Sequence, residues 1–103
     1  MKIHFRDVQA GSVEARAIIE IAEGVFLNEV TLLNIEGELV VEFPRKSFQG
    51  KTKKTIYIDI VTFEDTDKRL VWEIEIKEAY REWRKANKKV LVYDKNKIDG
   101  GSQ

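Results

Sequence analysis

The sequence predicts an α+β fold: an antiparallel β-sheet of four to six strands with one long C-terminal helix packed on it. Two observations lead to this prediction. Up to about residue 63, short apolar stretches alternate with polar residues and are separated by turn residues, as in half-buried antiparallel strands. Beyond residue 66 the apolar residues recur at helical spacing. A run of strands followed by one helix is typical of a sheet covered on one face.

The first two strands are expected over residues 2–8 and 13–22, joined by a turn at residues 10–12. The second strand alternates strongly, which predicts one buried and one solvent-facing set of side chains. The buried set is Val13, Ala15, Ala17, Ile19 and Ile21, and the solvent set is Glu14, Arg16 and Glu20.

The next strands are expected over residues 25–35, with an irregularity near Asn28, and over residues 39–43. Between them, Gly37 can adopt a positive φ at little cost and marks a hairpin turn. Pro44 cannot donate to a strand ladder and is expected to end the fourth strand. A fifth strand is expected over residues 55–63.

A helix is expected to run to about Ala86, starting where Thr66 or Asp67 can accept hydrogen bonds from free backbone N–H groups. Its first turns also alternate as a strand would, but the length of the pattern favours a helix. One helical face collects Trp72, Ile76, Ala79, Tyr80 and Trp83. Residues 1–90 then form a single domain, and residues 91–103 supply a short strand, expected over residues 90–94, and a frayed tail.

Charge is balanced but unevenly distributed. The 103 residues include 18 Lys and Arg and 18 Asp and Glu, giving a formal net charge of zero. No acid occurs from Phe43 to Ile58, and this stretch contains the basic segment Arg45–Lys54, which is expected to be an exposed loop turning at Gly50. A second run of cations follows at the end of the expected helix. Two basic patches are therefore possible on a polar molecule.

Cations on an exposed segment can neutralise phosphates, and an aromatic side chain among them can stack on a base. The candidate nucleic-acid-binding residues are Arg45, Lys46, Phe48, Lys51, Lys53, Lys54, Arg81, Arg84 and Lys85, with Lys88 and Lys89 extending the second group. Arg45, Ser47 and Gln49 are the polar residues nominated for base contacts. The alternatives are lysines that keep sheet edges from pairing and cations that complement a helix C-terminus.

Other classes of site find little support in the sequence. There is no cysteine and only one histidine, His4, so neither a disulfide nor a zinc site is expected. The helix glutamates lie near cations and no nucleophile or phosphate-loop motif occurs, so no catalytic residue, cofactor or small-molecule substrate is expected. No signal peptide or membrane span is apparent, so the expectation is a soluble cytoplasmic protein.

The segment "EVTLLNIEGELVVEFPRK" resembles the most characteristic stretch of the stage V sporulation protein G (SpoVG) family, a family of septation regulators. "ARAIIEI" is similar to an upstream strand of that family, and Asp59-Ile60 and Tyr80 match downstream positions. The resemblance covers roughly residues 2–84. The chain departs from the family where Ser47 replaces a third cation, where Ile58 replaces an Arg and where Phe63 replaces a Pro, and its basic loop is longer.

The resemblance implies a small β-sheet with a packed helix, a homodimer formed through sheet pairing, and binding of nucleic acid, DNA or RNA. It also implies a regulatory role in septation, sporulation or gene expression. The expected function is therefore that of a nucleic-acid-binding regulatory protein, with DNA favoured over RNA as the ligand. The alternative is a non-catalytic adaptor whose acidic strands and exposed sheet edges bind a protein partner.

Overall fold

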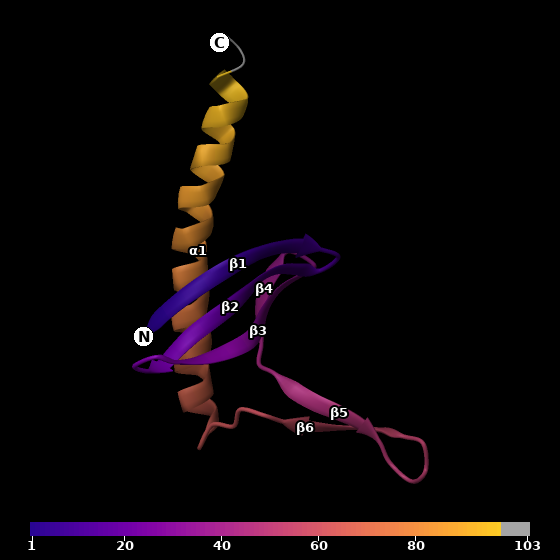
Figure 1. Cartoon of the computed structure of the whole chain (residues 1–103). Helices are drawn as coiled ribbons and strands as arrows, with labels where there is room; N and C mark the ends of the chain where they lie inside the picture. Colours follow the sequence, from indigo (N-terminus) through magenta and orange to yellow (C-terminus); the bar gives the residue numbers. More distant parts are fainter. Residues whose placement is uncertain (98–103) are drawn as a thin grey trace.

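The computed structural model describes residues 1–97 and the side chains of residues 1–87. It confirms the α+β fold, with six strands and one helix (Figure 1). Four strands form an antiparallel sheet in the order β1-β2-β3-β4, and two more form a separate hairpin. The elements are β1 (Lys2–Ala10), β2 (Val13–Ala22), β3 (Val25–Ile35), β4 (Glu38–Glu42), β5 (Arg45–Gln49), β6 (Thr55–Asp59) and α1 (Thr66–Lys97).

The core lies between α1 and one face of the four-stranded sheet. Ile76 and Tyr80 of the helix are buried against side chains of β2, β3 and the end of β4. These residues are Ala15, Ala17, Ile19, Val30, Leu32, Val41 and, directly after β4, Phe43. Trp72 and Trp83 pack beside the core and are half-buried, so the predicted apolar face of the helix is confirmed.

Two aromatic clusters flank Ile76 along the helix. At one end Phe63 lies between Phe43 and Trp72, with ring centroids 5.0 and 5.5 Å away. At the other end the centroid of Phe5 lies 5.5 Å from that of Tyr80. Edge-on aromatic pairs of this kind add stability beyond the area they bury. The helix is thus fixed to the sheet at both ends of its contact.

The expected irregularity near Asn28 is confirmed. Ala17 pairs with Val30 whereas Ile19 pairs with Leu27, so β3 carries an extra residue at this point, and Glu29 has a φ of 65°. The hairpin turn between β3 and β4 is also confirmed. Glu36 and Gly37 have φ values of 52° and 87°, which is the type I′ geometry that matches the twist of the flanking strands.

The alternation predicted for β2 is wrong at both of its ends. Val13 pairs with Leu33, but Ala15 pairs with Leu32, so β2 has an extra residue at Glu14. This β-bulge reverses the alternation. Glu14 bonds to the helix instead of facing solvent, and Val13 lies on the opposite face of the sheet. A further register shift before Ala22 leaves Ile21 53% exposed.

Three boundaries also differ from prediction. The helix does not end near Ala86 and give way to a strand over residues 90–94 but continues to Lys97. The tail expected over residues 95–103 is therefore wrong for its first three residues, and residues 98–103 lie outside the described residues. Asp65, rather than Thr66 or Asp67, caps the helix, since its Oδ1 accepts from the N–H of Lys68 at 2.8 Å. The fifth predicted strand stops at Asp59, because Phe63 turns into the core.

Candidate nucleic-acid interface

The basic segment is not the loop that the sequence predicts but most of a projecting β-hairpin. β5 and β6 pair in register from Arg45↔Asp59 to Gln49↔Thr55, and we call residues 45–59 the arm. Its tip closes where the N–H of Gly50 donates to the carbonyl of Lys54 and that of Lys53 donates to the carbonyl of Gly50, both at 2.9 Å. Figure 1 shows the arm extending away from the sheet and helix. Its strands are exposed throughout.

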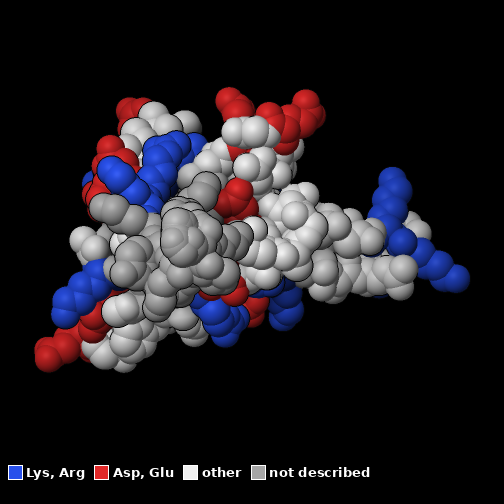
Figure 2. All heavy atoms as spheres, turned by 90° about the horizontal axis from the view of Figure 1, so that it is seen from above, with Lys and Arg blue, Asp and Glu red and all other residues white. Residues whose placement is uncertain are grey.

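The tip of the arm carries Lys51, Lys53 and Lys54. Figure 2 shows cations at the end of the arm with no acidic side chain beside them on this face. Within residues 1–87, none of the ion pairs involves these three lysines or Lys46. Exposed cations without a carboxylate partner remain available to phosphates.

The two faces of the arm differ in chemistry, because directly paired residues of antiparallel strands share a face. One face carries the pairs Phe48↔Ile56 and Lys46↔Ile58, and it is largely apolar. The other carries Arg45, Ser47, Gln49, Thr55, Tyr57 and Asp59. The three polar residues nominated for base contacts thus share this second face.

Arg45 lies at the base of the arm and differs from the lysines in being paired. Its Nη2 lies 3.6 Å from Oε2 of Glu42, and its guanidinium lies 5.0 Å from the centroid of the Tyr57 ring. A planar guanidinium stacks well on an aromatic face. Arg45 is thus held in place beside Tyr57, which makes it less available to a phosphate than the lysines at the tip.

The second group of candidate cations, near the end of the predicted helix, also contains both exposed and paired side chains. Arg81 and Lys85 are exposed on α1, whereas the Arg84 guanidinium is bound: its Nη2 lies 2.7 Å from Oδ1 of Asp7, and it stacks on Trp83 at 4.9 Å. Lys88 and Lys89 lie outside the residues whose side chains are described. In one chain this part of α1 lies on the far side of the sheet from the arm (Figure 1).

Arg84 belongs to a hydrogen-bonded cluster that joins α1 to the sheet, formed by Asp7, Glu14, Asn34, Tyr80 and Arg84. The Tyr80 hydroxyl donates to Oε1 of Glu14 at 2.5 Å and accepts from Nε of Arg84 at 3.0 Å. Asn34 donates to Oε2 of Glu14 at 2.9 Å. We call this set of residues the helix clamp.

The clamp shifts the titration of its members. The Tyr80 and Asn34 hydrogen bonds hold the pKa of Glu14 below its ordinary value, and the Arg84 hydrogen bond does the same for the pKa of Asp7. Burial, and then the bond to Glu14, raise the pKa of Tyr80. All these charges are satisfied within the clamp, so its role is to attach the helix.

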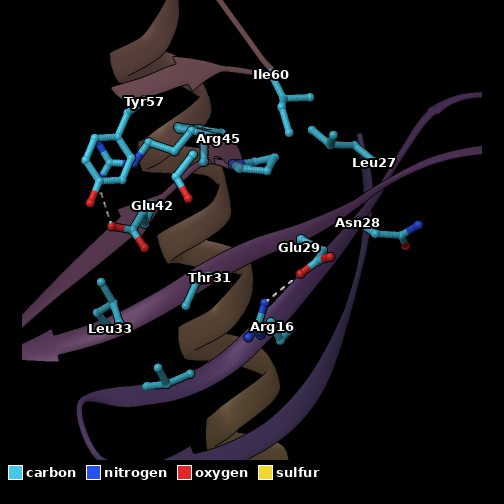
Figure 3. Close-up of a pocket in the computed structure, with 14 residues that line it drawn as sticks. Arg16, Leu27, Asn28, Glu29, Thr31, Leu33, Glu42, Arg45, Tyr57 and Ile60 are labelled. Atoms are coloured by element: carbon cyan, nitrogen blue, oxygen red, sulfur yellow. Dashed lines mark hydrogen bonds and ion pairs between the residues drawn. The ribbon is translucent and has the colours of Figure 1, made fainter. Parts of the chain in front are cut away.

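A groove of about 520 Å³ lies between the arm and the sheet face that α1 leaves open (Figure 3). The sheet contributes Arg16, Thr31 and Leu33, and the polar face of the arm contributes Arg45 and Tyr57. Arg16, Thr31 and Glu42 are register partners across β2, β3 and β4 and so lie in a row. Sequence reasoning missed this groove. The one indication of the groove in the sequence is Thr31, a polar residue within the apolar run of β3.

The described residues contain no cluster of three or more potential metal ligands. None of the described helical segments is long and apolar enough to cross a membrane. His4, the only histidine, is exposed on β1. No protein-family model, curated protein or solved structure matches this chain.

Proposed function

We propose that this chain is a nucleic-acid-binding regulatory protein of the SpoVG type that works in the cytoplasm as a homodimer. The observation that supports binding is the projecting arm, whose three tip lysines form no ion pair among the described side chains of residues 1–87. A net charge of zero keeps attraction to polyanions local to this tip. The resemblance of "EVTLLNIEGELVVEFPRK" to the SpoVG family supports the regulatory role. Arg81 and Lys85, both exposed, assist from a second site.

Removing two lysines from the tip should weaken binding and make it less sensitive to salt. Each phosphate contact in a single strand contributes about 0.7 to the slope of log affinity against log salt. The variant Lys51→Ala/Lys54→Ala should therefore lower that slope by about 1 to 2. The measurement is fluorescence anisotropy of labelled DNA and RNA oligonucleotides over a salt series.

Lys2→Ala/Lys68→Ala is the matched control for this experiment, because it removes the same charge from exposed positions away from the arm. It should leave the slope unchanged. Equal losses in the two double variants would show general electrostatic attraction and contradict a site at the tip. Absence of binding by the folded wild-type protein, even at low salt, would contradict nucleic-acid binding altogether.

The dimer proposal rests on the apolar face of the arm. A lone two-stranded hairpin is marginally stable in water, yet Phe48, Ile56 and Ile58 are 44%, 41% and 49% exposed. A second copy that pairs with the arm and covers this face would supply the missing contacts. Phe48 then serves the dimer contact in place of base stacking.

Replacing Phe48 by Glu should dissociate the dimer, since it places a charge within the proposed contact. Sedimentation velocity should show the wild-type protein at twice the chain mass and the variant at the chain mass. Thr55→Glu puts the same charge on the other face of the arm and should remain dimeric. A monomeric wild-type protein, or a Phe48→Glu variant that still dimerises, would contradict the proposed contact.

The same apolar face also gives the adaptor alternative its support, because it would suit a different protein as well as a second copy. The two functions differ in the salt dependence of binding. Binding to nucleic acid releases counterions and weakens steeply with salt, whereas an apolar protein contact does not. A folded, monomeric chain without affinity for nucleic acid would favour the adaptor.

A further inference from the structure

The groove between the arm and the open sheet face has a mixed floor, in which apolar side chains and a hydroxyl lie beside the charged Arg16 and Glu42. Val13 and Leu33 are register partners and supply its apolar part. Next to them lies Thr31, which is only 8% exposed. None of the side-chain hydrogen bonds found within residues 1–87 involves its hydroxyl. A buried hydroxyl without a partner marks a place where a ligand atom can complete the hydrogen bonding.

The charges around the groove are already neutralised in pairs. Arg16 bonds to Glu29 at 3.1 Å, and Arg45 lies 3.6 Å from Glu42. A phosphate placed here would have to compete with these two carboxylates for the two arginines. The groove therefore suits an uncharged group, and the unpaired lysines at the arm's tip remain the better place for a phosphate.

The wall of the groove offers a flat surface. Tyr57 is 60% exposed, and Arg45 lies over its ring. Aromatic rings and guanidinium planes are the surfaces on which proteins stack unpaired bases. Figure 3 shows Tyr57 and Arg45 extending from the arm on the side of the groove across from Thr31 and Leu33. A planar ligand can thus meet a stacking surface, an apolar floor and one hydroxyl that both donates and accepts.

We propose that this groove holds one unpaired nucleobase, so that the ligand of the protein is a single-stranded nucleic acid. The inference rests on the proposed function. The base stacks against the Arg45–Tyr57 pair and hydrogen-bonds to the Thr31 hydroxyl, while its strand continues along the arm toward the lysines. A paired base is already stacked and hydrogen-bonded within its duplex, and extracting it costs a few kcal/mol for each base.

The experiment is fluorescence anisotropy with labelled single-stranded homopolymer DNA and a blunt duplex of the same length. The single strand should bind at least about tenfold more tightly than the duplex, given the cost of unpairing a base. Tyr57→Ala should weaken single-strand binding by roughly five- to a hundredfold, as expected for loss of one stacked base. Thr31→Val keeps the shape of the side chain and should weaken it by roughly two- to tenfold, as expected for one hydrogen bond.

Tyr57→Phe and Thr31→Ser are the matched controls, since the first keeps the ring and the second keeps the hydroxyl. Both should bind nearly as the wild type does. Neither Tyr57→Ala nor Thr31→Val should change the salt slope, because neither touches the lysines at the tip. Such a result would separate the base site from the phosphate site.

Two outcomes would overturn the inference and leave the proposed function intact. One is equal affinity for single strand and duplex. The other is wild-type binding by both Tyr57→Ala and Thr31→Val while loss of the tip lysines still reduces the salt slope. Loss of the dimer in these two groove variants would instead identify the groove as a protein contact and also overturn the inference. If no oligonucleotide binds at all, the inference fails together with the proposed function.

Discussion

Replacing Ile76 by alanine is expected to lower the free energy of unfolding by about 2–5 kcal/mol. Ile76 is fully buried at the centre of the contact between α1 and the sheet, between the two aromatic clusters. Because those clusters hold the helix at both ends, it cannot easily move inward to fill the cavity that the substitution creates. A large share of the whole stability of a small domain would therefore be lost.

Urea unfolding followed by far-ultraviolet circular dichroism measures this effect. Ile74→Ala is the matched control, since it makes the same change two residues away on the same helix at a site that is 46% exposed. It should alter stability by less than about 0.5 kcal/mol. Similar losses in the two variants would mean that α1 does not pack on the sheet through the face that contains Ile76.

Replacing Tyr80 by alanine is expected to cost about 3–5 kcal/mol, a value typical of a large buried aromatic side chain. Tyr80 is 3% exposed, and its ring packs against Phe5. Tyr80→Phe measures the part of this loss of stability that is due to the hydroxyl. It should cost about 1–3 kcal/mol, because Glu14 and Arg84 each lose a hydrogen-bond partner. The same urea experiment measures both variants.

Tyr80→Phe should also change how stability depends on pH. The pKa of Glu14 is lowered in the folded state, chiefly by the Tyr80 hydrogen bond. Its contribution to stability is therefore complete above the unfolded pKa of about 4.3 and is lost as pH falls through the lower, folded value. Without the hydroxyl, the loss of stability between neutral pH and about pH 3 should be smaller. An unchanged acid dependence would show that this bond does not set the pKa of Glu14.

The sequence predicted the parts of the fold that repeat regularly. The central residues of β2 and the helix face around Ile76 follow undisturbed periods of two and 3.6, so their buried sides could be identified. The Glu36–Gly37 turn was equally clear, because a glycine between two alternating stretches favours a hairpin. These features depend on residues that are neighbours in the sequence.

What the sequence did not show depends on pairing between distant residues. β5 is exposed on both sides and rich in cations, so it lacks the apolar alternation that distinguishes a strand from a loop. Its structure comes from its register with β6. The groove was missed for the same reason: Arg16, Thr31 and Tyr57 belong to three different strands, and only the fold brings them together.

The bulge at Glu14 bears on how the helix clamp of this chain can evolve. One extra residue in β2 places the Glu14 carboxylate beside the Tyr80 hydroxyl, while Val13, just before it, pairs with Leu33 in the groove. Deleting Glu14 would join Val13 directly to Ala15, which restores simple alternation, keeps Val13 opposite Leu33 and removes the clamp carboxylate. A single-residue deletion would therefore release the helix clamp without changing the groove, so in descendants of this chain the two features can be lost separately.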